Sequence, residues 1–137
     1  MAEDHNASII AEFHANAGKV GGYFEGTTLL LLHHTGARSG QVRINPVGYQ
    51  QLDGGEVAIF ASKGGADTNP DWFYNVVANP HARAEIGTEI HDFVAHVAEG
   101  EERERIWTKQ KIDRPQFAAY EGKTTREIPV IVFKPVP

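Results

Sequence analysis

The sequence contains no cysteine and a single methionine among its 137 residues. The absence of cysteine excludes disulfide bonds, thiolate nucleophiles, Cys-ligated zinc and Cys-held iron–sulfur clusters. No positively charged segment precedes an apolar core segment of the kind found in secretory signals. The longest strongly apolar run, Leu29 to Leu32, is too short to span a bilayer. We therefore expect a cytoplasmic protein without stable membrane insertion.

An excess of basic residues is also lacking. The chain has 18 acidic against 13 basic residues, a formal net charge of -5. This balance argues against a broad nucleic-acid-binding face, so we expect no nucleic-acid partner. The length predicts one domain over residues 1–137 that can bury a core. Any anion-binding site must then be a local cluster of cations in an acidic background.

The apolar patterns predict a mainly β protein with flanking helices, of the α+β class. Helices are expected over 7–18, 71–79 and 100–112, strands over 28–34, 42–52, 56–62, 82–86, 89–98 and 128–134, and a Gly-rich connection over 18–27. Turn signals at Asp53–Gly55 and Gly87–Thr88 join neighbouring strands. Six strands linked by tight turns favour a small antiparallel barrel, and the βαβ rhythm of a Rossmann fold is absent.

The stretch HTGARSGQVRIN follows the first predicted strand and is rich in anion-binding groups. Arg38 and Arg43 carry guanidinium groups whose planar fork matches phosphate or carboxylate oxygens. Ser39 adds a hydroxyl, and Gly40 lets the backbone approach a ligand closely. The same composition is also typical of an ordinary polar hairpin with solvated arginines.

The stretch ASKGGA repeats this composition at the end of a later strand. Ser62, Lys63, Gly64 and Gly65 again combine a hydroxyl, a cation and glycines. If the intervening strands form a meander, both loops lie at the same end of the sheet and three cations converge. The helix entered at Pro70 directs its N-terminal amides toward the same region. Neither loop matches the phosphate-binding P-loop sequence.

Aromatic residues form a further cluster, whereas the histidines form no metal-binding pattern. Phe117 and Tyr120 are three residues apart on one side of a helical turn, where they serve either as core or as a wall for a flat ring. His33 and His34 are neighbours in a strand and point to opposite faces, so no metal site is predicted. With no nucleophile, metal or carboxylate pair, the chemistry is expected to come from an organic cofactor.

Four segments together resemble the deazaflavin-dependent nitroreductase family, whose actinobacterial members use the reduced deazaflavin coenzyme F420. These segments are FHANAGKVGG, LLLLHHTGARSGQVRINP, IFASKGGADTNPDWFYNVVANP and REIPVIVF, and the resemblance runs from about Ile9 to Phe133. Each motif alone is weak, but their common order and spacing make the resemblance specific. It implies a split β-barrel related to the flavin-mononucleotide reductases.

The resemblance also implies roles for individual positions. Coenzyme contacts are implied at Arg38, Ser39, Gly40, Arg43, Asn45, Pro46, Ser62, Lys63, Gly64, Gly65, Pro70, Asp71 and Trp72. The substrate side is implied at Phe117, Tyr120 and Tyr49. The sequence departs from many relatives at Ala37, where they carry a cation, and at Gly48 and Phe117, where they carry tyrosine.

The implied function is an F420H2-dependent oxidoreductase that transfers a hydride to a small electron-poor acceptor, namely a quinone, an enone or lactone, or a nitroaromatic. Tyr120, or an ordered water, is expected to donate a proton or a hydrogen bond to the developing anion. Two alternatives stay open at this point, an FMN-binding split-barrel reductase and a non-catalytic F420 carrier. A monomer and a homodimer both fit the sequence.

Overall fold

The computed structural model describes residues 2–19 and 28–136. Most of the predicted Gly-rich connection, residues 20–27, lies outside the described residues. The elements are α1 (Ala2–Ala15), β1 (Leu29–Thr35), β2 (Val42–Gln51), β3 (Val57–Phe60), α2 (Asp71–Ala78), β4 (His81–Ile86), β5 (Glu89–Val97), α3 (Gly100–Asp113), α4 (Gln116–Lys123) and β6 (Val130–Pro135), with short 3-10 turns at Asp53–Gly55 and Lys63–Gly65. Along these ranges no helix is both long and apolar enough to cross a membrane.

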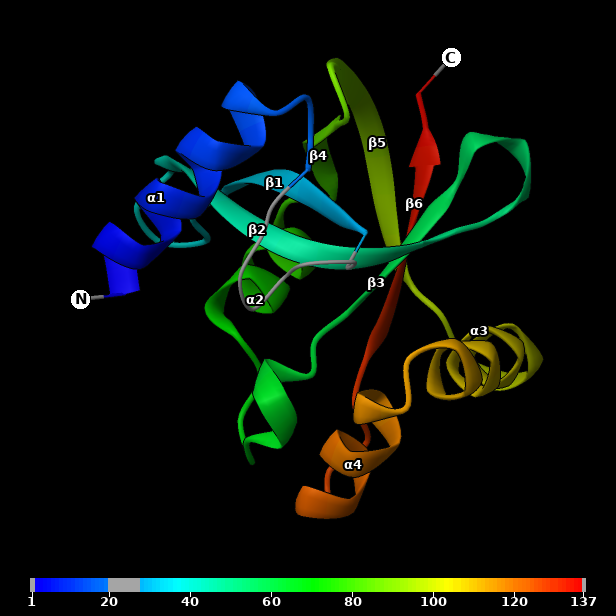
Figure 1. Ribbon diagram of the computed structural model, residues 1–137. Helices are drawn as coiled ribbons and strands as arrows, with labels where there is room; N and C mark the ends of the chain where they lie inside the picture. The colour runs from blue at the N-terminus through cyan, green and yellow to red at the C-terminus, as the bar shows by residue number, and fades with distance from the viewer. Residues whose placement is uncertain (1, 20–27, 137) are drawn as a thin grey trace.

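The six strands form a closed antiparallel barrel in the order β1-β2-β3-β6-β5-β4. This confirms the predicted six-stranded barrel with flanking helices. Figure 1 shows α1 beside the upper part of the barrel and α3 and α4 below it. The largest differences from the prediction are that α1 begins earlier, at Ala2, and that α4 is a separate helix where the sequence indicated only a helical turn.

The barrel interior is filled by apolar side chains that alternate along the strands. Leu30, Leu32, Phe93 and Phe133 are at most 2% exposed and belong to one cluster. The residues between them on β1 point outward, where Leu29 and Leu31 pack under Ile9 and Phe13 of α1. Burial of β1 on both faces explains its unbroken apolar run.

Strand β2 changes its partner along its length. Its first part, Val42–Gly48, pairs with β1, whereas pairing with β3 covers only Tyr49–Gln51. Pro46 has no N–H to donate, and it lies in the part of β2 that faces β1 alone. The barrel wall therefore opens between Pro46–Gly48 on β2 and Phe60 at the end of β3, and a cavity lies in this opening.

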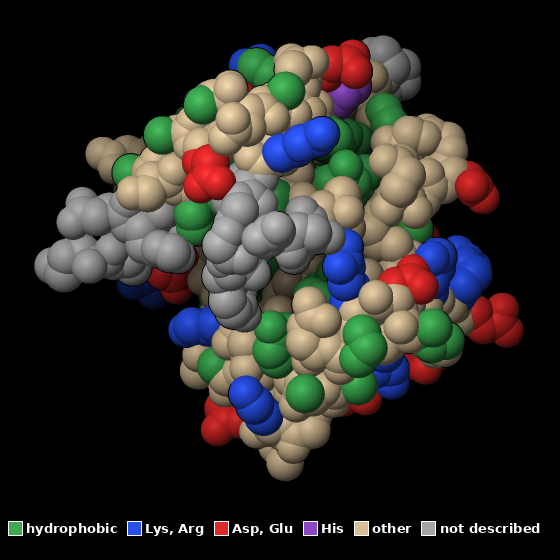
Figure 2. Space-filling view, in the orientation of Figure 1, with side chains coloured by type: hydrophobic (Ala, Val, Ile, Leu, Met, Phe, Trp, Pro, Cys, Tyr) green, Lys and Arg blue, Asp and Glu red, His purple; other side chains and the backbone are tan. Residues whose placement is uncertain are grey.

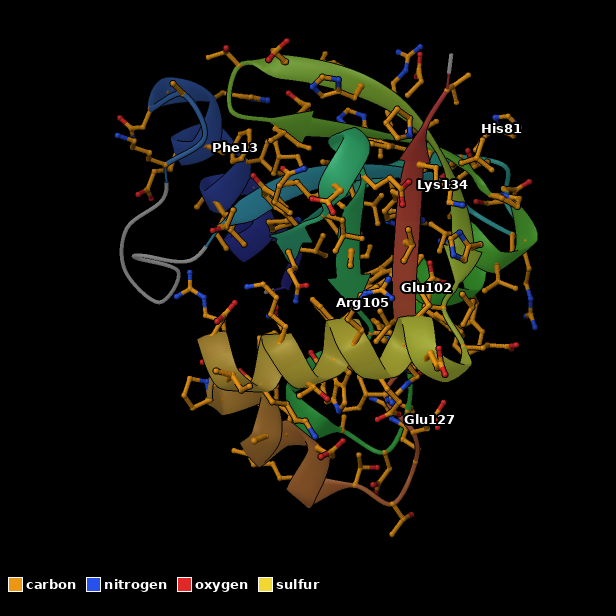
Figure 3. All side chains as sticks on the ribbon, turned by 90° about the vertical axis from the view of Figure 1, so that its right-hand side faces the viewer. Phe13, His81, Glu102, Arg105, Glu127 and Lys134 are labelled. Carbon is orange, nitrogen blue, oxygen red and sulfur yellow. The ribbon has the colours of Figure 1, made fainter. Side chains whose placement is uncertain are left out.

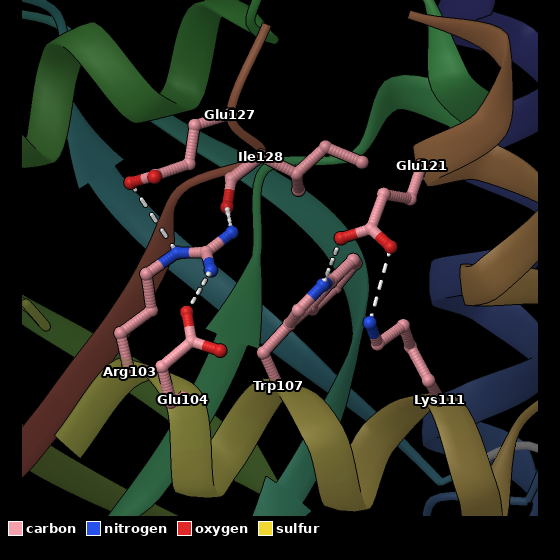
Figure 4. Close-up of polar contacts among 7 residues, drawn as sticks. All are labelled: Arg103, Glu104, Trp107, Lys111, Glu121, Glu127 and Ile128. Atoms are coloured by element: carbon pink, nitrogen blue, oxygen red, sulfur yellow. Dashed lines mark hydrogen bonds and ion pairs between the residues drawn. The ribbon is translucent and has the colours of Figure 1, made fainter. Parts of the chain in front are cut away.

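Helix α3 fixes α4 beneath this opening. The indole Nε1–H of Trp107 and the Nζ of Lys111 both donate to the carboxylate of Glu121 on α4, the second at 3.1 Å (Figure 4). The hydrogen bond from Trp107, together with Lys111, lowers the pKa of Glu121. Trp107 also packs against Phe60 with ring centroids 5.8 Å apart. The position of α4 is therefore set by the barrel through α3.

The N-terminal half of α3 is anchored to the segment that leads into β6. The guanidinium of Arg103 donates to the carbonyl oxygen of Ile128 at 2.9 Å and forms ion pairs with Glu104 and Glu127 (Figure 4). In Figure 3, α3 crosses the lower end of β6, with Glu102 and Glu127 near the crossing. Both ends of the α3–α4 unit are thus tied to the barrel.

We predict that Phe13→Ala destabilises the protein by about 3–5 kcal/mol, because it leaves a cavity between α1 and the barrel. Phe13 is only 1% exposed. Ile112→Ala serves as the control, since Ile112 is 72% exposed, and we expect it to change stability by less than about 0.5 kcal/mol. Urea denaturation of both variants measures the difference. Equal effects would show that α1 contributes little to the core.

Candidate functional site

The two predicted loops lie at the same end of the barrel. Strands β1 and β3 run in the same direction on either side of β2, so the chain leaves both strands at one end. There, Arg38, Arg43 and Lys63 line a single cavity of about 1050 Å3, which we call the cationic cavity. The convergence of three cations predicted from the meander is therefore confirmed.

The three cations have no carboxylate partner among residues 2–19 and 28–136. Within the described ranges none of them forms an ion pair, and the Nζ of Lys63 donates to the hydroxyl of Thr68 at 3.2 Å. Asp71 lines the same cavity and is the one acidic residue that the described part of the chain contributes to its lining. Figure 2 shows basic and acidic side chains interspersed on the face it presents. The cationic cavity is thus a local positive region in an acidic protein.

The first loop is a tight turn closed by its own hydrogen bonds. The N–H of Gly36 donates to the carbonyl of Gln41 at 2.8 Å, and the N–H of Gly40 donates to the carbonyl of Gly36 at 3.0 Å. Gly40 has a φ of +70°, which favours glycine. Gly40 lies outside the lining of the cavity, whereas Arg38 and Ser39 line it. The turn therefore projects the Arg38 side chain while its own backbone is fixed.

The second loop has an unusual backbone that is held by a remote arginine. Lys63, Gly64 and Gly65 have successive φ values of +47°, +65° and +88°. This conformation is unfavourable for a lysine and is typical of residues constrained for function. Arg126 spans the loop, donating to the carbonyls of Ser62 and Ala66 at 2.9 and 2.8 Å and to the Asn69 side chain at 2.7 Å.

Gly65 connects this loop to α4. A Cβ at Gly65 would lie 2.9 Å from the carbonyl oxygen of Tyr120, so no larger residue fits without a shift. Gly65 is buried and lies outside the lining of the cationic cavity. Because Gly65 has no side chain, the Lys63 loop packs directly on α4, the helix that carries Phe117 and Tyr120.

A second cavity of about 460 Å3, the aromatic cavity, adjoins the cationic one. The two share Lys63, Pro70 and Trp72 in their linings and so form one continuous groove. Phe117 and Tyr120 line the aromatic cavity with ring centroids 5.2 Å apart. Their predicted position on one side of a helix is confirmed. Pro46, Ser62 and Gly64 also line this cavity.

A polar relay centred on the buried His34 lies in the lining of the cationic cavity. The Nδ2 of Asn75 donates to Nδ1 of His34 at 3.0 Å, and Nε2 of His34 donates to Oδ1 of Asn45 at 2.6 Å. Oδ1 of Asn75 accepts the backbone N–H of Ala37 at 2.9 Å. Burial lowers the pKa of His34, which is 2% exposed, and keeps the imidazole neutral. The relay joins β1, β2, α2 and the first loop.

Other residues of the groove had no recognisable signal in the sequence. Besides His34 and Asn75, these are Ile10, Tyr74, Gln116 and the positioning residue Arg126. Ile10 comes from α1, and only the packing of that helix on β1 brings it to the cavity. The spacing of the histidines excludes a metal-ligand pattern, but it carries no information on the hydrogen-bonding role of His34. Across the described residues no cluster of His, Asp and Glu could hold a metal ion.

Tyr49, implied by the resemblance as a substrate-side residue, lies elsewhere. It packs against the core cluster of the barrel and is absent from the lining of both cavities. Burial raises the pKa of its phenol. Its hydroxyl is therefore a less direct candidate for substrate contact than that of Tyr120.

The barrel and its groove place the protein in the class of split-barrel reductases. A solved structure of an F420-H2 dependent reductase (FDR-A) matches with a TM-score of 0.72 and 38% identity, over 78% of this chain and 94% of that chain. A second solved chain, described as a domain-swapped dimer, matches with a TM-score of 0.74 and 33% identity over 97% of each chain.

Comparison of sequences gives the family. The family of F420H(2)-dependent quinone reductases matches residues 8–135. The F420H(2)-dependent quinone reductase Rv1261c of Mycobacterium tuberculosis (strain H37Rv) is 31% identical over 126 residues, which cover 89% of this chain and 84% of the relative. The chain therefore belongs to the F420H(2)-dependent quinone reductase family. It is an oxidoreductase, and its cofactor is coenzyme F420.

We predict that Arg126→Ala lowers stability by about 2–3 kcal/mol, because three hydrogen bonds that constrain the Lys63 loop are lost. Arg83→Ala is the matched control: its ion pair with Asp92 joins two side chains that are 61% and 63% exposed. We expect this control to cost less than about 1 kcal/mol. Urea denaturation compares the two. A smaller loss for Arg126→Ala than for Arg83→Ala would contradict the constraint.

The burial of His34 predicts a pH dependence of stability. As pH falls below about 6.5, the ordinary histidine pKa, the unfolded chain takes up a proton that the folded chain does not, since the folded pKa is lowered. The free energy of unfolding therefore decreases toward acid pH. His34→Gln removes this contribution. Urea denaturation at about pH 7.5 and 5.5 should give a smaller decrease for His34→Gln than for the wild type; equal decreases would contradict the assignment.

Proposed function

We propose that the continuous groove binds reduced F420, with its phosphate and polyglutamate tail at the cationic cavity and its ring near Pro70 and Trp72. A quinone, or another flat electron-poor acceptor, then occupies the aromatic cavity. One observation carries this proposal. Two cavities adjoin each other: one is lined by three cations that have no carboxylate partner among the described residues, and the other has aromatic walls. Their chemistry fits the two ends of the coenzyme.

The cations are suited to anionic groups in different ways. The guanidinium groups of Arg38 and Arg43 provide paired donors for phosphate or carboxylate oxygens. Ser62 is in the right-handed region and Lys63 has a positive φ, an alternation that makes successive backbone N–H groups converge on an anion. The second loop thus supports an anion with its backbone as well as with the Lys63 ammonium.

Bound reduced F420 supplies the hydride. The residues of this chain supply orientation: binding of the tail by Arg38, Arg43 and Lys63 is remote binding energy that aligns the reacting ring. Tyr120 lines the aromatic cavity, and its proposed role is to donate a hydrogen bond from its hydroxyl to an oxygen of the acceptor.

A quinone is the preferred acceptor class because its flat ring suits the aromatic walls and its carbonyl oxygens can accept from Tyr120. Enones, lactones and nitroaromatics also carry oxygen atoms that can accept a hydrogen bond, so they belong in the same test. Family membership favours F420 over FMN as the cofactor. A non-catalytic carrier role predicts binding of the coenzyme without its oxidation by any acceptor.

Anaerobic titration of the protein with reduced F420, followed by addition of acceptors, tests the proposal. We expect saturable binding and then oxidation of the coenzyme by a benzoquinone or naphthoquinone. Absence of binding up to about 100 μM, within the ordinary range for enzyme ligands, would contradict the cofactor site. Binding without oxidation by quinones, enones, lactones or nitroaromatics would support the carrier role.

We predict that Lys63→Ala weakens F420 binding about tenfold while the melting temperature changes little, because an exposed ammonium that faces the coenzyme tail is removed. The weakening should shrink at high salt. Lys109→Ala is the control, since Lys109 lies on α3 and pairs with Asp113. A large loss of stability with unchanged binding would show that Lys63 is a structural residue.

A further inference from the structure

We propose that His34 is a positioning residue of the groove: its neutral imidazole holds the amide of Asn45 so that the NH2 group faces the groove as a hydrogen-bond donor. Through Asn75, the same imidazole holds the loop that carries Arg38. The inference rests on the proposed function, since the partner of the Asn45 donor is an oxygen of the bound coenzyme.

The direction of each hydrogen bond follows from one unambiguous donor. The backbone N–H of Ala37 can only donate, so the atom of Asn75 that lies 2.9 Å away must be its oxygen. The other end of the Asn75 amide is then its NH2 group, which donates to Nδ1 of His34. An imidazole that accepts at Nδ1 is neutral and carries its proton on Nε2.

The proton on Nε2 in turn fixes Asn45. The atom of Asn45 that lies 2.6 Å from Nε2 must accept and is therefore Oδ1. The Nδ2 of Asn45 is left to the groove, where it donates to no atom of residues 2–19 or 28–136. Asn45 thus presents two N–H bonds to a ligand, and the matching partner is a carbonyl or phosphate oxygen.

The relay works only with a neutral imidazole. Protonated His34 would place an N–H at Nδ1 against the NH2 of Asn75, and Asn75 cannot turn over without losing the N–H of Ala37. Burial maintains the neutral form, and the titratable groups that act electrostatically on His34 are Arg43 on β2, His33 on β1 and Asp71 on α2. Two of these three groups disfavour protonation and Asp71 favours it.

The neighbouring histidine provides a matched control. His33 points to the other face of β1, where its Nε2 lies 2.6 Å from the carboxylate of Glu85, and it is absent from the lining of the groove. The Glu85 carboxylate also contacts His14 on α1 at 2.8 Å. A substitution at His33 therefore perturbs the same strand and a comparable hydrogen bond without touching the relay.

The first experiment requires no coenzyme and uses one variant only to assign the His34 signals. Nitrogen-15 NMR of the histidine rings reports which nitrogen carries the proton. We expect His34, assigned by its absence from the spectrum of His34→Gln, to be protonated on Nε2 and unprotonated on Nδ1 at neutral pH. Protonation on Nδ1, or on both nitrogens, would overturn the proposal.

The second experiment measures binding of reduced F420 to the wild type, His34→Phe, His34→Gln and His33→Phe. We expect His34→Phe to bind about tenfold more weakly, His33→Phe to bind like the wild type, and His34→Gln, which keeps one donor and one acceptor, to recover part of the loss. Equal binding by His34→Phe and His33→Phe would overturn the proposal.

The experiments distinguish a failure of the proposed F420 site from a failure of the proposed role of His34. If the wild type does not bind reduced F420, the proposed function fails, whereas the proton position on His34 still tests the relay. If the wild type binds and His34→Phe binds equally well, only the positioning role fails. Should His34→Phe not fold, His34→Gln and the NMR measurement decide. The expected results are then binding by His34→Gln that is weaker than binding by the wild type, and a proton on Nε2 of His34 in the wild type. Binding by His34→Gln equal to that of the wild type would overturn the positioning role.

Discussion

The groove depends on the change of partner along β2. If β2 paired with β3 over its whole length, the barrel wall would be continuous and the segment Pro46–Gly48 would be covered. Instead β2 pairs with β1 up to Gly48 and with β3 only from Tyr49. Pro46 lacks the N–H that a second neighbouring strand would need, so it is compatible with this opening. The aromatic cavity lies there, with α4 as its outer wall.

Other residues hold the backbone of the two loops at the cationic cavity. The cationic side chains of these loops are therefore available to contact a ligand. Arg126 constrains the loop of Lys63, and the relay through His34 and Asn75 constrains the loop of Arg38. Hydrogen bonds that fix the loops in advance reduce the ordering required when a ligand binds. The division between anchoring and contacting residues thus preorganises a positive site in a protein whose net charge is -5.

Much of the site was predictable because its residues cluster in two short loops. Arg38, Arg43 and Lys63 were recognisable by composition, and their convergence followed from the direction of β1 and β3 in a meander. Phe117 and Tyr120 followed from helical spacing. Arg126 and Asn75 were not predictable in this way, since each acts on a loop that is distant along the chain. The full extent of α4 was not predicted, since the contacts that hold this eight-residue helix come from Trp107 and Lys111 on α3.

The sequence by itself determined the six strands, their tight turns, the cationic loops and the resemblance to F420-dependent reductases, because alternation, turn residues and motif spacing are local properties. The tertiary structure alone decided that the two cavities join at Trp72, that Gly65 packs on α4, and that His34 is a neutral hydrogen-bonding residue rather than a solvated one. These features arise from barrel closure, which brings residues of β1, β2, α2 and α4 into contact. Burial and hydrogen-bond direction exist only once those contacts form.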